Sequence, residues 1–266
     1  MIIPWLDWAS LAIRWLHLAA GIAWIGTSFY FIWLERSLRA RENLPKGVQG
    51  ESWSVHGGGF YHVQKYAVAP EAMPDDLHWF KYEAYFTWLS GFALLIVLYY
   101  FGASTYLIDS TRADLTPTMA IGISVAFLIG TWGLYEALCR SPIGRSTTVL
   151  ASSVLVLILV SAFLLTQIFS DRAAFLHVGA LIGTIMSANV FVVIIPNQKK
   201  VVADLLDKKR PDPSLGAQAR QRSLHNNYLT LPVLLLMVSA HYPLLFSGGA
   251  AWGWLVVGFI IVIGAI

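Results

Sequence analysis

Seven long apolar runs occupy most of this 266-residue chain, and they restrict its fold more than any other feature. A helix that crosses the hydrocarbon core of a bilayer needs ~20 mostly apolar residues. Charged residues form 12% of the chain, about half of the ~25% that is usual in soluble proteins. We therefore predict an all-α, polytopic transmembrane helical bundle of about seven spans. The predicted spans are Trp8–Leu34, Trp79–Phe101, Thr118–Leu138, Thr147–Ile168, Arg172–Ile195, Tyr228–Phe246 and Trp252–Ile266.

The last predicted span begins at Trp252 and is still apolar at Ile266. These residues would rise only ~22 Å as a helix, whereas the hydrocarbon core is ~30 Å thick. We therefore expect the natural chain to continue beyond this point and to cross the membrane an eighth time.

The 18 Lys and Arg residues are unevenly distributed between the connections. All except Arg14, Arg112 and Arg172 lie in or beside the connections after the first, third and fifth spans. The positive-inside rule then places residues 35–78 and 196–227 in the cytoplasm and the N-terminus outside. The net charge of +3 thus reports topology, and we expect no nucleic-acid partner.

The single cysteine, Cys139, excludes an intrachain disulfide, a four-cysteine iron–sulfur site and a CxxCH haem attachment in these residues. A redox cofactor in this part of the chain must therefore be held without a covalent bond. Histidine is the most suitable residue for that purpose.

Four histidines follow a pattern that predicts a parallel four-plus-four repeat. His17 and His177 lie in the outer halves of spans one and five, and His78 and His225 lie at the cytoplasmic starts of spans two and six. Two imidazoles at matched depth can hold haem b noncovalently. We predict that His17 and His177 ligate haem iron, with His241 as a substitute. The competing interpretation is that each histidine hydrogen-bonds a neighbouring helix.

Polar residues also gather at the cytoplasmic starts of spans two and six. Residues three or four apart share a helix face, so these positions form polar stripes there. The residues concerned are His78, Lys81, Tyr82, Glu83, His225, Asn226, Asn227 and Tyr228. We predict a pocket that offers amides, aromatic faces, a cation and a titratable base. The competing interpretation is a belt of aromatic and charged residues at the headgroup level.

Three motifs carry a resemblance to a known family: Gly58-Gly59-Phe60-Tyr61, Leu77-His78-Trp79-Phe80-Lys81-Tyr82-Glu83, and Arg222-Ser223-Leu224-His225-Asn226-Asn227-Tyr228. They resemble the membrane domain of PuuD-type urate oxidases, bacterial cytochrome c-linked enzymes that are also called urate hydroxylases. The resemblance covers nearly the whole chain. It implies that residues 1–266 form the integral membrane domain and that a cytochrome c domain with haem c belongs to the intact protein.

The resemblance implies oxidation of urate to 5-hydroxyisourate in the bacterial inner membrane. It also implies that water supplies the oxygen atom and that a cytochrome c domain or soluble cytochrome c takes the electrons. The histidine pair adds the hypothesis that these electrons cross the membrane domain through haem b on His17 and His177. The predicted catalytic bases are then His78, Glu83 and His225. The predicted contacts to the planar, anionic urate ring are Lys81, Tyr82, Asn226, Asn227 and Tyr228.

Two other functions use the same features. A cytochrome b-like electron relay would share the histidine pair but oxidise a quinol in a pocket open to lipid. A non-redox transporter also fits parallel repeats and polar residues near the midplane. Such a transporter would move substrate across vesicles and carry no visible chromophore.

Overall fold

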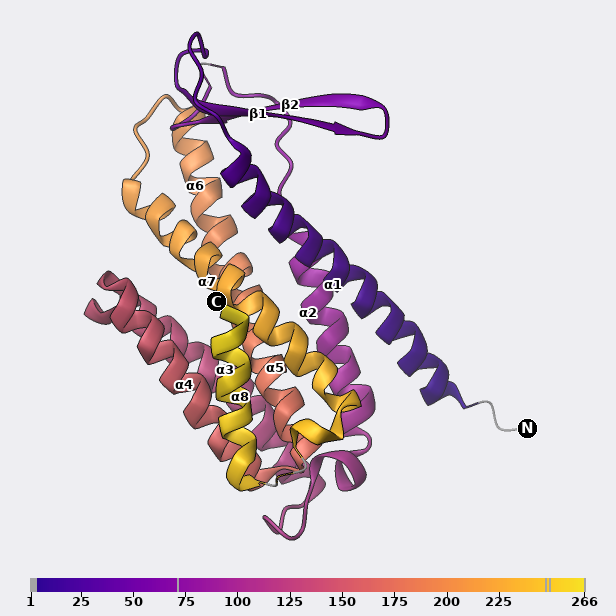
Figure 1. Cartoon of the computed structure of the whole chain (residues 1–266). Coiled ribbons are helices and arrows are strands. Elements are labelled where there is room, and N and C mark those ends of the chain that lie inside the picture. The colour runs from indigo at the N-terminus through magenta and orange to yellow at the C-terminus, as the bar shows by residue number, and fades with distance from the viewer. Residues whose placement is uncertain (1–3, 71, 247, 249, 266) are drawn as a thin grey trace.

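The computed structural model describes residues 4–70, 72–246, 248 and 250–265 (Figure 1). It confirms an all-α bundle, to which a two-stranded sheet is added. The elements are α1 (Trp5–Ser37), β1 (Val48–His56), β2 (Gly59–Tyr66), α2 (Tyr82–Leu95), η1 (Ile96–Tyr100), η2 (Ala103–Leu107), α3 (Pro117–Arg140), η3 (Pro142–Arg145), α4 (Thr147–Ile168), α5 (Asp171–Ala188), η4 (Asn189–Ile194), α6 (Ile195–Leu206), α7 (Pro213–Val238), η5 (Ser239–His241), η6 (Pro243–Leu245) and α8 (Ala250–Ala265).

Five of the described helical segments are long and apolar enough to cross a membrane, and they correspond to the first five predicted spans. The α5, η4 and α6 segments form one continuous helical path over Asp171–Leu206. The turns η1, η2 and η4 are π-helical. The predicted sixth span is different, because α7 ends at Val238 and two 3-10 turns follow it.

Helix α7 also begins earlier than the predicted sixth span. The side chain of Asp212 accepts a hydrogen bond from the Ser214 backbone N–H at 2.8 Å, and Pro213 occupies the first helical position. The backbone N–H and the hydroxyl group of Ser214 both donate to the Asp212 carboxylate, and these hydrogen bonds lower its pKa. His225 therefore lies well inside α7 and not at its start, which corrects the predicted match with His78.

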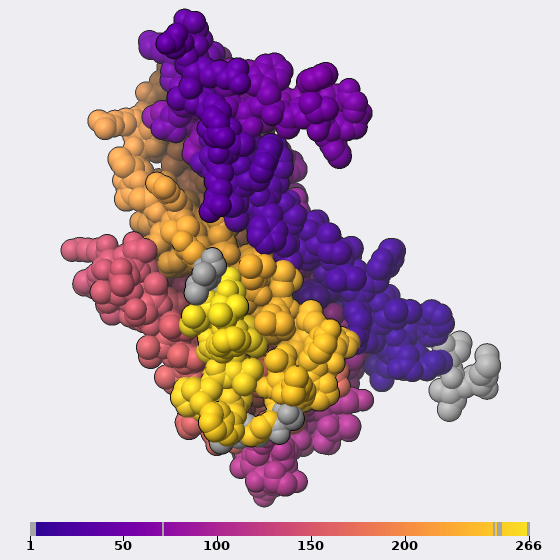
Figure 2. Space-filling view, in the orientation of Figure 1, coloured from indigo at the N-terminus to yellow at the C-terminus, as the bar shows by residue number. Residues whose placement is uncertain are grey.

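The core of the bundle surrounds α5. This helix packs against α2, α3, α4 and α7, and its side chains Phe175, Leu181 and Ile185 are fully buried. Helix α8 packs against α4 and α7. Helix α1 packs along α2 on the flank of the molecule, where Figure 2 shows it as a long ridge. Its large apolar side chains remain exposed, as expected for a surface that faces lipid.

An antiparallel hairpin of β1 and β2 projects beside the end of α1 (Figures 1 and 2). The turn between the strands contains Gly57 and Gly58 at φ values of +56° and +79°, which glycine adopts without strain. Ser37 and Ser52 share a hydrogen bond of 2.7 Å that fastens the hairpin to α1. We call this end of the molecule, which also carries α6, the hairpin end.

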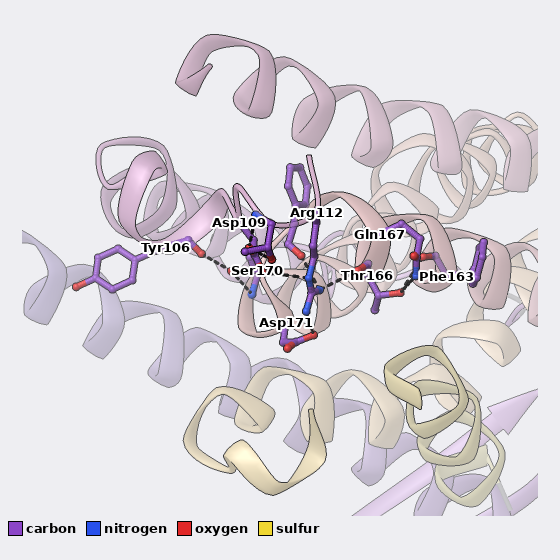
Figure 3. Close-up of polar contacts among 11 residues, drawn as sticks. Tyr106, Asp109, Arg112, Phe163, Thr166, Gln167, Ser170 and Asp171 are labelled. Carbon is purple, nitrogen blue, oxygen red and sulfur yellow. Dashed lines mark hydrogen bonds and ion pairs between the residues drawn. The ribbon is translucent and has the colours of Figure 1, made fainter. Parts of the chain in front are cut away.

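At the opposite end, Arg112 makes hydrogen bonds and ion pairs with several segments of the chain (Figure 3). Arg112 donates to the carbonyl oxygens of Thr166 and Phe169 at 2.8 and 2.9 Å. It also pairs with Asp171 at 2.6 Å and with Asp109 at 3.1 Å. The guanidinium group thus joins the loop before α3 to the end of α4 and the start of α5.

Candidate functional site

A buried polar cluster lies between α3, η4 and α7, toward the hairpin end. The Tyr135 hydroxyl and His225 Nδ1 are 2.7 Å apart, and Asn189 Nδ2 donates to the Tyr135 oxygen at 3.0 Å. Asn189 Nδ2 also donates to Asn226 Oδ1 at 2.9 Å, and Asn226 Nδ2 donates to the Met186 carbonyl at 3.0 Å. Side chains from α3, η4 and α7, with a carbonyl group of α5, thus form one hydrogen-bonded network.

The π-helical turn η4 explains how Asn189 enters this network. Single π-helical turns reorient side chains and are frequent at functional sites. Asn189 opens η4 and is almost fully buried, and its Oδ1 atom has no hydrogen-bond partner among the described residues. A buried amide with an unpaired oxygen in a hydrogen-bonded network is a candidate contact for a ligand donor.

Arg222 lies one turn before His225 on α7 and adds a buried charge to the cluster. Its Nη2 atom pairs with Glu136 Oε2 at 2.9 Å, and its guanidinium carbon lies 5.1 Å from the centre of the Tyr135 ring. The residue is only 3% exposed. Tyr135 therefore contacts both the arginine and the histidine, through its ring and its hydroxyl respectively.

A cavity of about 320 Å³ opens beside this arginine. Its lining comes from the end of α3, the η3 turn, Val193 of η4 and the first half of α7. The polar side chains that line it are Glu136, Arg140, Ser141, Arg145, Gln218, Gln221 and Arg222, together with Cys139.

The predicted residues at the start of α2 do not join this cluster. His78 is exposed and packs edge-on against Phe80, and Tyr82 is exposed with the Lys81 ammonium 4.7 Å from its ring centre. The side chain of Glu83 makes no hydrogen bond or ion pair with the described residues. The turn η4 contacts both groups of residues, because Phe191 packs edge-on against Tyr85 of α2 and Asn189 belongs to the buried cluster.

Among the predicted residues of α7, His225 and Asn226 enter the buried cluster and the next two do not. Asn227 is half-buried, and Tyr228 is 53% exposed. Consecutive residues of a helix point in different directions, which accounts for the division. The structure thus brings two of the eight residues predicted for this pocket, His225 and Asn226, into the buried cluster.

The two histidines predicted to ligate haem are held by different helices. His17 Nδ1 lies 2.9 Å from the Thr87 carbonyl oxygen on α2. His177 Nδ1 lies 2.7 Å from the Ala173 carbonyl oxygen, and its Nε2 lies 2.7 Å from Ser124 Oγ on α3. No ring contact joins His17 to His177 in the described part of the chain. His241 is exposed in η5.

A haem ligand needs an imidazole nitrogen that carries a lone pair. A carbonyl oxygen only accepts, so Nδ1 of each histidine is the protonated nitrogen and Nε2 carries the lone pair. Nε2 of His17 has no hydrogen-bond partner among the described residues, and it fits this requirement as it stands. Nε2 of His177 does not fit it as it stands, because Ser124 occupies this nitrogen and the side chain is only 1% exposed, packed against Tyr99 and Phe169.

The sequence matches the family described as urate oxidase N-terminal over residues 4–266. The chain belongs to the urate oxidase N-terminal family. No curated protein and no solved structure gives a significant match to it.

Membership of the urate oxidase N-terminal family supports a role in urate oxidation, with urate as the substrate. Within this family member, the buried cluster supplies groups that suit a planar, amide-rich anion. Three of its members were not predicted from the sequence as site residues: Tyr135, Asn189 and Arg222. Asn189 could have been predicted from the sequence, because burying an amide side chain in an apolar span is costly unless the amide has a hydrogen-bond partner.

Proposed function

We propose that this membrane domain oxidises urate to 5-hydroxyisourate and passes the electrons to cytochrome c. The family match and the buried cluster around Tyr135, His225 and Arg222 support the proposal. In this reaction one water molecule adds its oxygen to urate, two protons are released, and two molecules of ferricytochrome c each accept one electron.

Of the three candidate bases, we prefer His225. It is the one predicted catalytic residue inside the buried cluster, and Tyr135 fixes its Nδ1 atom. When Nδ1 donates to the Tyr135 oxygen, Nε2 carries the lone pair that takes a proton as electrons leave urate. His78 and Glu83 stay candidates for proton transfer at the exposed start of α2, where Lys81 and Tyr82 would meet the anionic substrate.

We propose that Asn226, which lies in the buried network, and Asn227, which follows it on α7, make amide contacts to urate. Tyr228, the next residue of α7, is a further proposed contact. The sidedness follows from the basic residues, so the hairpin end faces the cytoplasm of a bacterial inner membrane and the opposite end faces outward. Cytochrome c would therefore approach the opposite end.

Haem b is the proposed electron carrier in the membrane domain, with His17 and His177 as its ligands. Bound haem would supply one-electron transfer between urate and cytochrome c. His17 contributes an imidazole that is already oriented by Thr87 and Ser90, at 2.9 and 3.1 Å from Nδ1. The residue His241 remains the substitute ligand.

A coupled assay tests the proposed reaction. The detergent-solubilised chain is mixed with urate and ferricytochrome c, and urate loss and cytochrome reduction are followed together. We expect two cytochromes reduced per urate. His225→Gln should lower kcat by about 100-fold or more, as expected when a general base is removed. His56→Gln is the matched control, because this histidine lies at the exposed hairpin turn. Urate loss without cytochrome reduction would contradict the proposed electron acceptor.

A visible spectrum tests the haem separately. The purified chain should show a haem band that urate bleaches or shifts under anaerobic conditions, and His17→Ala should remove or displace that band. A chain that consumes urate but shows no haem band would refute the ligation by histidine while leaving the reaction in place.

A further inference from the structure

The guanidinium group of Arg222 is incompletely satisfied within the protein. Its Nη2 atom is paired with Glu136, but its Nε and Nη1 atoms are buried without a hydrogen-bond partner among the described residues. Buried charged donors are seldom left unpaired, because water can no longer solvate them. Arg222 also lines the cavity described above, so a small rotation of its side chain would bring these unpaired donors to a ligand acceptor there.

Arg112 shows what a structural arginine looks like in the same molecule. Its Nη1 atom donates to two carbonyl oxygens, and its Nη2 and Nε atoms face Asp171 and Asp109. Every nitrogen of that group has a protein partner. Arg222 is more deeply buried, with a side-chain exposure of 4% against 14%, yet it has a partner at only one nitrogen.

The charge of the cavity favours an anion. Arg140, Arg145 and Arg222 line it, and Glu136 is its one carboxylate among the described lining residues, which leaves two positive charges in excess. The volume of about 320 Å³ lies at the lower end of the ~300–1,000 Å³ typical of small-molecule sites. A ligand of the size of a single purine suits such a space.

Two glutamines on the wall present unused amide atoms. Gln218 Oε1 accepts from Asn197 at 3.3 Å, and its Nε2 donor has no partner among the described residues. Gln221 Nε2 donates to the Gly144 carbonyl at 2.9 Å, and its Oε1 acceptor is unpaired within the described part of the chain. An open donor and an open acceptor complement a ring that has both C=O and N–H groups along its edge.

We propose that the cavity beside Arg222 binds urate as its anion, with Arg222, Gln218 and Gln221 as recognition residues. The identity of this anion rests on the proposed function, and the site itself rests on the unpaired guanidinium edge and the lining. Arg222 and His225 share one face of α7, and both contact Tyr135. Urate held by Arg222 would therefore lie on the same side of α7 as the proposed base.

Equilibrium dialysis of the solubilised chain against labelled urate tests this site directly. Arg222→Gln should weaken urate binding about 10- to 100-fold, as expected for the loss of charge-assisted hydrogen bonds. Gln218→Glu provides a second variant that does not disturb a buried residue. It keeps the acceptor for Asn197 and adds a negative charge to the cavity, so it should also weaken binding. Arg220→Gln, at an exposed position of α7 outside the lining, should bind urate as the wild-type chain does.

The possible results distinguish an error in the proposed binding site from an error in the proposed function. If both cavity variants bind urate like the wild-type chain while urate turnover persists, the proposed site is wrong and the proposed function stands. If the chain binds inorganic phosphate in an Arg222-dependent manner but neither binds nor consumes urate, the urate assignment and the proposed function are both wrong. Weakened urate binding in both variants, with Arg220→Gln unaffected, supports the proposal.

Discussion

Tyr135 on α3 holds the imidazole of His225 on α7, with 2.7 Å between the phenol oxygen and Nδ1, although the two residues are 90 positions apart in the sequence. Asn189 donates to the same phenol oxygen from a third helical segment. The orientation of the proposed base therefore depends on the packing of three helices. A histidine fixed in this way always presents the same ring nitrogen away from its partner.

Replacing Tyr135 by phenylalanine should impair turnover more than substrate binding. The ring that packs on Arg222 would remain, but His225 and Asn189 would lose the hydroxyl. Misorientation of a catalytic group costs up to about 100-fold in rate, so we expect a fall in kcat of that order with little change in KM. Steady-state kinetics measure both. Tyr30→Phe, at an exposed position of α1, is the control. An increase in KM at unchanged kcat would contradict a positioning role.

Gly91 allows His17 to lie against α2. A Cβ atom at Gly91 would be 2.8 Å from His17 Cε1, whereas nothing lies within 4 Å of one at Gly122 on α3. Gly91→Ala should therefore destabilise the protein by about 1–3 kcal/mol, and Gly122→Ala should stabilise it by about 0.5–1 kcal/mol. Thermal unfolding in detergent measures both effects. Adding His17→Ala to Gly91→Ala should remove most of the penalty; no such coupling would refute the contact.

We expect Arg112 to stabilise the fold without contributing to urate binding. Its replacement by glutamine leaves two carbonyl oxygens and two carboxylates without their donor, at a cost of about 1–3 kcal/mol. The melting temperature should fall while urate affinity is unchanged. Weaker urate binding at the original stability would show that the opposite end takes part in the site.

The hairpin should loosen only in acid. The hydrogen bond from His62 lowers the pKa of Glu51 below 4.5, with further help from the charges of His62 and Arg41. A lowered carboxyl pKa contributes stability that is present above pH 4.5 and is lost as the pH falls through the lowered value. Hydrogen exchange measures the protection of the β1 and β2 amides in the wild-type chain and in Glu51→Gln over a range of pH. The wild-type amides should be better protected at neutral pH, and the two proteins should become equal only below pH 4.5. Equal protection in both proteins at neutral pH would contradict this role.

The first five membrane spans were predictable, because length and hydropathy largely determine which segments lipid accepts. The hairpin was not, since residues 48–66 show weak alternation of apolar and polar side chains, and its turn glycines were the clearest signal. The start of α7 was missed for a related reason. Its first half is polar and lies outside the apolar run, although the Asp212-Pro213 cap marks the true beginning.

The candidate site was predictable only on the helix that carries its clearest motif. His225 and Asn226 were found because they are adjacent polar residues at the edge of an apolar run. Tyr135 and Asn189 were not, because their contacts depend on how α3 and η4 pack against α7. Arg222 belongs to the same motif, but burial distinguishes it from the exposed Arg220, and burial is a property of the fold.

Anaerobic turnover in oxygen-18-labelled water tests the central claim most directly. The solubilised chain would be given urate and ferricytochrome c without oxygen gas, and the products would be analysed by mass spectrometry. Urate oxidation by this membrane domain predicts that urate is consumed, that one labelled oxygen enters each product molecule, and that two cytochromes are reduced per urate. Urate that remains intact until oxygen gas is admitted would contradict the account.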